Sequence, residues 1–209
     1  MSLIQFGACP LSPAQTRFTL WAPQARRVEL MRDDAAQPMQ RDESGLWTIE
    51  AAAPAGSAYQ YRIDGETLVP DPASRAQQQD VHGPSLVVDL TYAWQHLAWR
   101  GRPLSETVIY ELHVGAMGGF AGVMGHLPRL AALGVTAIQL MPVADFPGRW
   151  NWGYDGVLPY APDAAYGTPA ELQALVDAAH GLGLQVFLDV VYNHFGPDGN
   201  YLHGYASDF

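Results

Sequence analysis

The stretch Leu184-Gln-Val-Phe-Leu-Asp-Val-Val-Tyr-Asn-His194 decides the fold of the second half of the chain. Residues 184–191 form a nearly continuous apolar run, the pattern of a parallel strand that is buried on both faces. Asp189 lies inside this run, and Asn193 and His194 follow at its end. Because the functional groups of parallel α/β folds gather at the carboxyl ends of the strands, we expect a site here.

A helix is predicted immediately before this strand, over residues 168–182. Thr168 can cap it, Pro169 suits its first position, and Glu171 stands where a capping box needs it. Two further strands, at 108–114 and 135–141, flank a helix predicted from Met124 to Leu133. Strands that alternate with helices predict a parallel sheet of βαβ units.

The connection that follows residue 141 is unusually long, at roughly 25 residues where a few suffice. It contains Phe146-Pro-Gly-Arg-Trp-Asn-Trp-Gly-Tyr-Asp-Gly156. Aromatic faces pack on the C–H faces of sugar rings, and neighbouring carboxylates, amides and imidazoles bind hydroxyls, so carbohydrate is the expected ligand. Trp150 and Trp152 either line a sugar cleft or pack under the loop. Asp155 either contacts substrate or locks the loop through Arg149.

The first 90 residues have a different pattern, with short alternating strands separated by turns. Strands are predicted at 17–22, 27–31, 45–50 and 58–63, with turns at 33–34, 54–56 and 64–65. This spacing predicts a β-sandwich. Residues 70–86 lack periodicity and are expected to be irregular. We therefore divide the chain into a sandwich at 1–90, a linker at 91–106 and an α/β unit at 107–209.

Composition excludes several classes of function. The 209 residues include 11 basic side chains, all arginine, and 21 acidic ones, and the formal net charge of −10 disfavours nucleic acid as a partner. No signal peptide and no apolar run long enough to span a membrane are found, so a cytoplasmic protein without a membrane partner is expected. One cysteine, Cys9, cannot form an internal disulfide.

Several of these segments resemble the α-amylase superfamily. Asp189–His194 is similar to the superfamily's short signature at the end of the third barrel strand, and Trp152-Gly-Tyr-Asp155 to its motif after the second. Residues 18–23 and 28–30 resemble the immunoglobulin-like, starch-binding-type module found ahead of branching, debranching and trehalohydrolase enzymes. Segments 71–75, 81–85, 108–115, 140–143 and 146–148 are most similar to the malto-oligosyltrehalose trehalohydrolases.

The resemblance implies an immunoglobulin-like β-sandwich followed by the first part of a TIM (β/α)8 barrel, with three strands and their helices. It also implies roles: Tyr154 stacks on a glucose ring beside the scissile bond, and His194 binds that ring's hydroxyls. Asp189, as a buried charge that needs a partner, would orient the strand end. Trp152, Asp155 and Asn193 are further substrate-binding candidates. Although Asn193 corresponds to a calcium ligand in many α-amylases, no acidic cluster accompanies it, and no metal or other cofactor is expected.

The implied activity is hydrolysis of the α-1,4 bond next to the trehalose unit of malto-oligosyltrehalose, with retention of configuration. Retaining glycosidases use two carboxyl groups, which in this superfamily come from the fourth and fifth barrel strands. The chain contains three such strands, so no catalytic residue is expected in it. We therefore expect the chain to be inactive by itself and to require the rest of the barrel as a partner. Gly115–Phe120 is shorter than usual, which puts substrate contacts from that loop in doubt. A branching or debranching enzyme and a non-catalytic α-glucan-binding protein remain alternatives.

Overall fold

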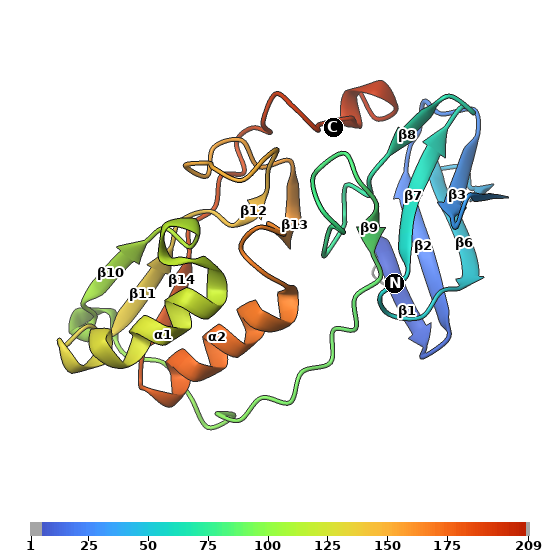
Figure 1. Cartoon of the computed structure of the whole chain (residues 1–209). Coiled ribbons are helices and arrows are strands. Elements are labelled where there is room, and N and C mark those ends of the chain that lie inside the picture. Colours follow the sequence, from blue (N-terminus) through green and yellow to red (C-terminus); the bar gives the residue numbers. More distant parts are fainter. Residues whose placement is uncertain (1–5, 208–209) are drawn as a thin grey trace.

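A computed structural model describes residues 6–207 and shows a β-sandwich, an α/β unit and a long connection between them (Figure 1). One sheet of the sandwich has the order β1-β2-β6-β5, and the other has the order β4-β3-β7-β8, with β9 paired to β7. Their bounds are β1 Gly7–Ser12, β2 Gln15–Trp21, β3 Val28–Arg32, β4 Ala35–Pro38, β5 Gln40–Arg41, β6 Leu46–Ala52, β7 Ala58–Ile63, β8 Thr67–Val69 and β9 Ser85–Leu86.

Alternation along the strands builds the sandwich core. In β7 every second side chain, those of Tyr59, Tyr61 and Ile63, is buried. Phe18 of β2 is fully buried and meets the Tyr59 ring edge-on, with ring centroids 4.8 Å apart. The antiparallel sandwich predicted from these alternations is therefore confirmed.

The alternation of apolar and polar residues predicts some elements of the sandwich and misses others. Asp33, Asp34 and Asp64 have positive φ, as expected for the predicted turns at 33–34 and 64–65. In contrast, β4 and β5 were not predicted, because every residue in them is exposed and neither has an apolar pattern. Residues 70–86 are irregular except where β9 begins.

The α/β unit is a parallel sheet in the order β10-β11-β14, with α1 and α2 packed on one face (Figure 1). The bounds are β10 Ile109–Leu112, β11 Ala137–Leu140, β14 Gln185–Leu188, α1 Gly119–Ala132 and α2 Pro169–Gly181, with 3-10 turns η1 Leu104–Glu106, η2 Gly115–Met117 and η3 Leu202–Gly204. Phe120, Leu127 and Leu175 of the helices are fully buried with Ile138 and Leu140 of β11. The three predicted strands and their parallel pairing are confirmed.

The predicted ends of the two helices differ in accuracy. The Thr168 hydroxyl oxygen accepts a hydrogen bond from the Glu171 N–H at 3.2 Å, and the Glu171 carboxylate accepts one from the Thr168 N–H at 2.6 Å, so the capping box of α2 is confirmed. The predicted start of α1 at Met124 is wrong, because the helix begins at Gly119. Gly118 and Gly119 both have positive φ, and this pair turns the chain directly into the helix.

The long connection after residue 141 contains β12 (Ala144–Asp145) and β13 (Leu158–Pro162), which pair as an antiparallel hairpin. One further expectation about the α/β unit needs correction. The run at 184–191 is not buried on both faces: β14 is half-buried, and Leu188 and Val190 are 51% and 42% exposed. The reason is its position, because β14 is an edge strand of the described sheet and the helices cover one face only.

The C-terminal segment returns to the sandwich (Figure 1, red). Tyr205 and Ala206 are buried in the sandwich core, and the Tyr205 carbonyl accepts a hydrogen bond from the Gln24 N–H at 3.2 Å. His82 contacts the Tyr201 hydroxyl at 2.6 Å and Asp198 at 3.2 Å. Residues of the predicted 107–209 unit thus complete the hydrophobic core of the sandwich. Among the described residues, no helix has the length and apolarity to cross a membrane.

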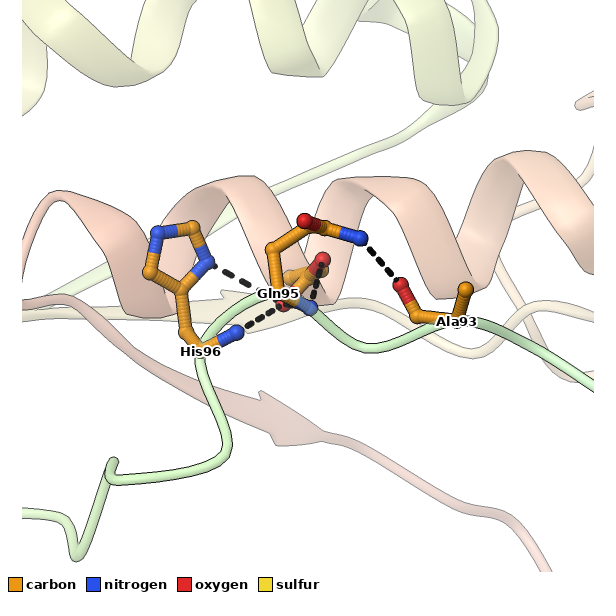
Figure 2. Close-up of polar contacts among 4 residues, drawn as sticks. Ala93, Gln95 and His96 are labelled. Carbon is orange, nitrogen blue, oxygen red and sulfur yellow. Dashed lines mark hydrogen bonds and ion pairs between the residues drawn. The ribbon is translucent and has the colours of Figure 1, made fainter.

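The connection from residue 87 to 103 contains neither helix nor strand and is fastened to α2 (Figure 2). The Asp177 carboxylate of α2 accepts hydrogen bonds from the backbone N–H of Gln95 at 2.9 Å and of His96 at 3.1 Å. Its Oδ1 also lies 3.1 Å from the His96 Nδ1. The Trp99 ring stacks on His180, with ring centroids 5.3 Å apart. One carboxylate therefore holds the middle of the connection in place.

Replacing Asp177 by alanine is expected to release this connection, because both backbone donors lose their acceptor. Trypsin should then cleave after Arg100 faster than in the wild type, as judged by the half-life of the intact chain on gels. Asp177→Asn retains an acceptor oxygen and serves as the matched control, with a smaller acceleration. Equal half-lives for all three proteins would contradict the role given to Asp177.

Candidate functional site

The parallel register brings three strand ends to one edge of the sheet. Leu112 pairs with Leu140, and Leu140 with Leu188. The next residues continue the ladder, since the Asp189 N–H bonds to the Leu140 carbonyl at 2.9 Å. Residues 113, 141–142 and 189–195 therefore meet where ligands of parallel α/β folds are found.

His194 and Tyr154, predicted separately from two motifs, come together at this edge. The His194 Nε2 lies 2.9 Å from the Tyr154 carbonyl oxygen, and its Nδ1 lies 3.0 Å from the Asn193 side-chain nitrogen. Because the amide donates to Nδ1, Nε2 carries the proton and donates to the carbonyl. Both ring nitrogens are thus bonded within the protein, and a sugar hydroxyl reaches His194 only by replacing one of these partners.

Asn151 organises the aromatic loop, residues 146–156, a role that was not predicted from the sequence. Its Oδ1 accepts hydrogen bonds from the N–H groups of Gly153 at 2.5 Å and Tyr154 at 3.1 Å. Its Nδ2 donates to Asp155 at 3.0 Å. Of the two alternatives for Asp155, the lock on the loop is present, but its partner is Asn151 and not Arg149. The sequence signal was the asparagine itself, since Asn side chains commonly bond the backbone two residues on.

His113, the residue that follows β10, also fastens this loop. Its Nδ1 accepts a hydrogen bond from the Ala116 N–H at 3.1 Å, so Nε2 carries the proton and donates to the Asn151 carbonyl at 2.5 Å. Gly153 permits the close approach on the other side, because its φ is +102° and a Cβ there would lie 2.7 Å from Pro142. The loop is thus held to the ends of both β10 and β11.

The aromatic rings of the site are exposed and are not packed under the loop. Trp150, Trp152 and Tyr154 are 81%, 74% and 62% exposed, and Tyr160 and Tyr192 are also exposed. Trp152 has one ring contact, edge-on to His113 at 6.1 Å between centroids. Of the two readings of the tryptophans, the structure contradicts burial. Tyr160 and Tyr192 were not predicted, although Tyr192 lies within the Asp189–His194 motif.

A cavity of about 370 Å³ lies at this edge. Its walls come from the ends of β11 and β14, the aromatic loop and β13, and they include Pro142, Tyr154, Tyr160, Asp189, Tyr192, His194 and Phe195. The predicted residues Tyr154, His194 and Asp189 therefore share one cavity, whereas Trp152, Asp155 and Asn193 do not line it. Asp189 was expected to be a buried charge, but it is exposed in the described sheet, where β14 is the edge strand. Its role in orienting the strand end stays a prediction.

Comparisons with known proteins agree with this geometry. The model of the family described as "Alpha amylase, catalytic domain" matches residues 74–208. The chain belongs to the alpha-amylase family. Residues 5–80 match "Carbohydrate-binding module 48 (Isoamylase N-terminal domain)". The fold is therefore an immunoglobulin-like module followed by part of an alpha-amylase catalytic domain. The two family matches overlap at residues 74–80 and do not test the domain boundaries at 90 and 107, which stay predictions.

Among relatives of this alpha-amylase family member, a malto-oligosyltrehalose trehalohydrolase from Deinococcus radiodurans is 47% identical over 98% of the chain and 35% of its own length. The same enzyme from Saccharolobus solfataricus is 46% identical over 88% of the chain and 34% of its length. A 1,4-alpha-glucan branching enzyme from Pseudomonas fluorescens is 35% identical, over 91% of the chain and 30% of its length. The chain spans about a third of the length of these relatives.

Solved structures of the alpha-amylase family give the same result. A pullulanase from Paenibacillus barengoltzii, in complex with maltohexaose and alpha-cyclodextrin, superposes with a TM-score of 0.80 at 28% identity. The match covers 98% of the chain and 40% of the pullulanase. A Salmonella typhimurium protein described as an alpha amylase reaches 0.94 at 47% identity, covering 98% of the chain and 36% of that protein. These likenesses support the architecture across almost the whole chain.

Proposed function

We propose that this chain is the N-terminal part of an enzyme that releases trehalose from malto-oligosyltrehalose by hydrolysing the adjacent α-1,4 bond. The observation that carries the proposal is the cavity in which Tyr154 and His194 meet at the strand ends. The identity of 45% or more to four trehalohydrolases supports this substrate over that of the branching enzyme at 35%.

The proposed reaction is a double displacement. A carboxylate attacks the anomeric carbon while a carboxylic acid protonates the departing oxygen, and water then hydrolyses the glycosyl-enzyme ester with the second group as base. By family resemblance both carboxyl groups, and the aspartate that stabilises the transition state, come from later barrel strands. We therefore expect the 209 residues alone to bind glucan without cleaving it.

The residues of this chain would bind and orient the sugar. The exposed Tyr154 ring offers a flat face in the cavity wall, and Tyr160 and Tyr192 add two more. His194 holds the Tyr154 backbone in place and becomes a donor to a hydroxyl when that hydroxyl displaces the Tyr154 carbonyl. Asp189 offers an exposed carboxylate on the same wall. Trp152, Asp155 and Asn193 would act by supporting the loop and His194.

The test is trehalose release from malto-oligosyltrehalose by the complete product of the gene that encodes this chain. Chromatography of the products should show trehalose, with much slower cleavage of a plain malto-oligosaccharide. Formation of α-1,6 branches would instead identify a branching enzyme. Binding with no bond cleaved would favour a non-catalytic glucan-binding protein. The 209-residue chain, run in parallel, should release no trehalose, and release by it would refute the placement of the catalytic carboxylates.

A further inference from the structure

Three carboxyl side chains from both units of the molecule converge beneath the aromatic loop. Asp145 ends β12, Asp163 follows β13, and Asp80 belongs to the irregular segment of the sandwich. Asp145 and Asp163 are only 1% and 2% exposed, and Asp80 is half-buried. This cluster lies apart from the cavity described above, which it does not line.

Hydrogen-bond donors satisfy two of these carboxylates and not the third. Asp163 accepts from the N–H groups of Ala165 at 2.8 Å and Phe146 at 3.2 Å, one on each oxygen. Asp80 accepts from Val81 at 2.7 Å and Gly148 at 3.1 Å, again one on each oxygen. Asp145 has a single long bond, from the Ala164 N–H to Oδ2 at 3.4 Å.

The Oδ1 of Asp145 is buried without a hydrogen-bond partner in the described part of the chain. A buried carboxylate oxygen that accepts no hydrogen bond is costly when it is charged, and protonation removes the charge. No group of three His, Cys, Asp or Glu side chains among residues 6–207 is placed to hold a metal ion. A proton on Asp145 therefore relieves the cluster of its least compensated charge.

The neighbouring charges act in the same direction. Burial, followed by the charges of Asp163 and Asp80, raises the pKa of Asp145 to about 8. Burial raises the pKa of Asp163 to about 6, and it raises that of the adjacent Tyr166 to about 12. Arg149, close by in sequence, is exposed. Near neutral pH, Asp163 is thus largely charged while Asp145 is largely neutral.

Hydrogen bonds join this cluster to the aromatic loop. Asp163 holds the Phe146 N–H, and Asp80 of the sandwich holds the Gly148 N–H, just before Trp150, Trp152 and Tyr154. We propose that Asp145 is a proton-dependent positioning residue: while protonated it lets the three carboxyls pack together, which fastens the base of the aromatic loop to the sandwich. Loss of the proton to solvent places repelling charges at this junction and favours release of the loop.

The direction of the pH effect follows from linkage. The pKa of Asp145 is raised in the closed junction and is ordinary when the loop opens, so the closed junction binds the proton more tightly. The closed form is therefore favoured most below about pH 4, loses stability as pH rises to about 8, and changes little beyond that. Asp163 adds a similar effect that ends at about pH 6.

Hydrogen exchange of the amides in residues 146–156 tests this inference in the full chain. Exchange rates, corrected for intrinsic base catalysis, are compared at about pH 6.5 and about pH 8, where Asp145 alone should contribute. In the wild type, loop protection should fall by up to about tenfold per pH unit, the limit for one proton. Asp145→Asn is neutral at both pH values and should abolish the fall. Asp34→Asn, at an exposed turn far from the cluster, should retain it.

The outcomes separate this inference from the proposed function, because exchange is measured without glucan. A fall in wild-type protection that is absent in Asp145→Asn supports the inference even if no sugar binds. An equal fall in both proteins, or no fall in the wild type, overturns it even if trehalose is released. Should Asp145→Asn not fold, Asp163→Asn provides the second test. It removes a neighbouring charge, so the fall should end at a lower pH.

Discussion

Replacing Phe18 by alanine is expected to destabilise the sandwich by about 3–5 kcal/mol, the usual cost of removing a buried phenylalanine. Phe18 is fully buried and lies edge-on to Tyr59, whose hydroxyl donates a hydrogen bond to the buried Asp71 at 2.6 Å. The cavity left by alanine would therefore border the buried ring of Tyr59 and loosen the packing that holds this hydroxyl against Asp71. Because a small domain has only about 5–15 kcal/mol of stability, this single change is severe.

Urea unfolding followed by circular dichroism measures the loss. Phe6→Ala is the matched control, because Phe6 is 44% exposed and its truncation removes far less buried area. The midpoint for Phe18→Ala should drop well below that of the wild type, and the midpoint for Phe6→Ala should stay close to it. If the urea midpoints of both variants shift equally, Phe18 does not contribute more to the stability of the core than the exposed Phe6 does.

The sequence predicts an element well where its pattern is local. The alternation at 58–63 gives β7, and Thr168, Pro169 and Glu171 give the start of α2, because each signal lies within a few residues. The start of α1 escapes prediction for the opposite reason. Glycines at 118 and 119 indicate a loop, whereas in the structure the Phe120 N–H of the first helical turn bonds to the Tyr166 carbonyl at 2.9 Å, a partner that no local pattern reveals.

The site shows the same division. Tyr154 and His194 follow from two motifs at strand ends, and parallel pairing alone brings them together. The carboxyl cluster does not follow from sequence, because Asp80 and Asp145 are 65 positions apart in different units and neither belongs to a motif.

Replacing Tyr154 by alanine is expected to weaken malto-oligosaccharide binding by about 10–100-fold, the range expected when a large aromatic contact of about 1.5–3 kcal/mol is removed. The substitution isolates the ring, because the bond from His194 goes to the Tyr154 backbone carbonyl and alanine keeps that carbonyl. The two Asn151 bonds that shape the loop also go to backbone N–H groups. The loop should therefore keep its shape while it loses one exposed aromatic face.

Tyr154→Phe is the matched control for this change, since it keeps the flat ring and removes only the hydroxyl. Calorimetric titration with maltoheptaose should place its affinity near that of the wild type, well above that of Tyr154→Ala. A loss of equal size in both variants would mean that the hydroxyl, and not the ring, contacts the sugar. Unchanged affinity in both would mean that glucan does not reach this wall of the cavity. Stacking on glucan would then have to come from elsewhere in the cavity, where Tyr160 and Tyr192 are the other exposed tyrosines.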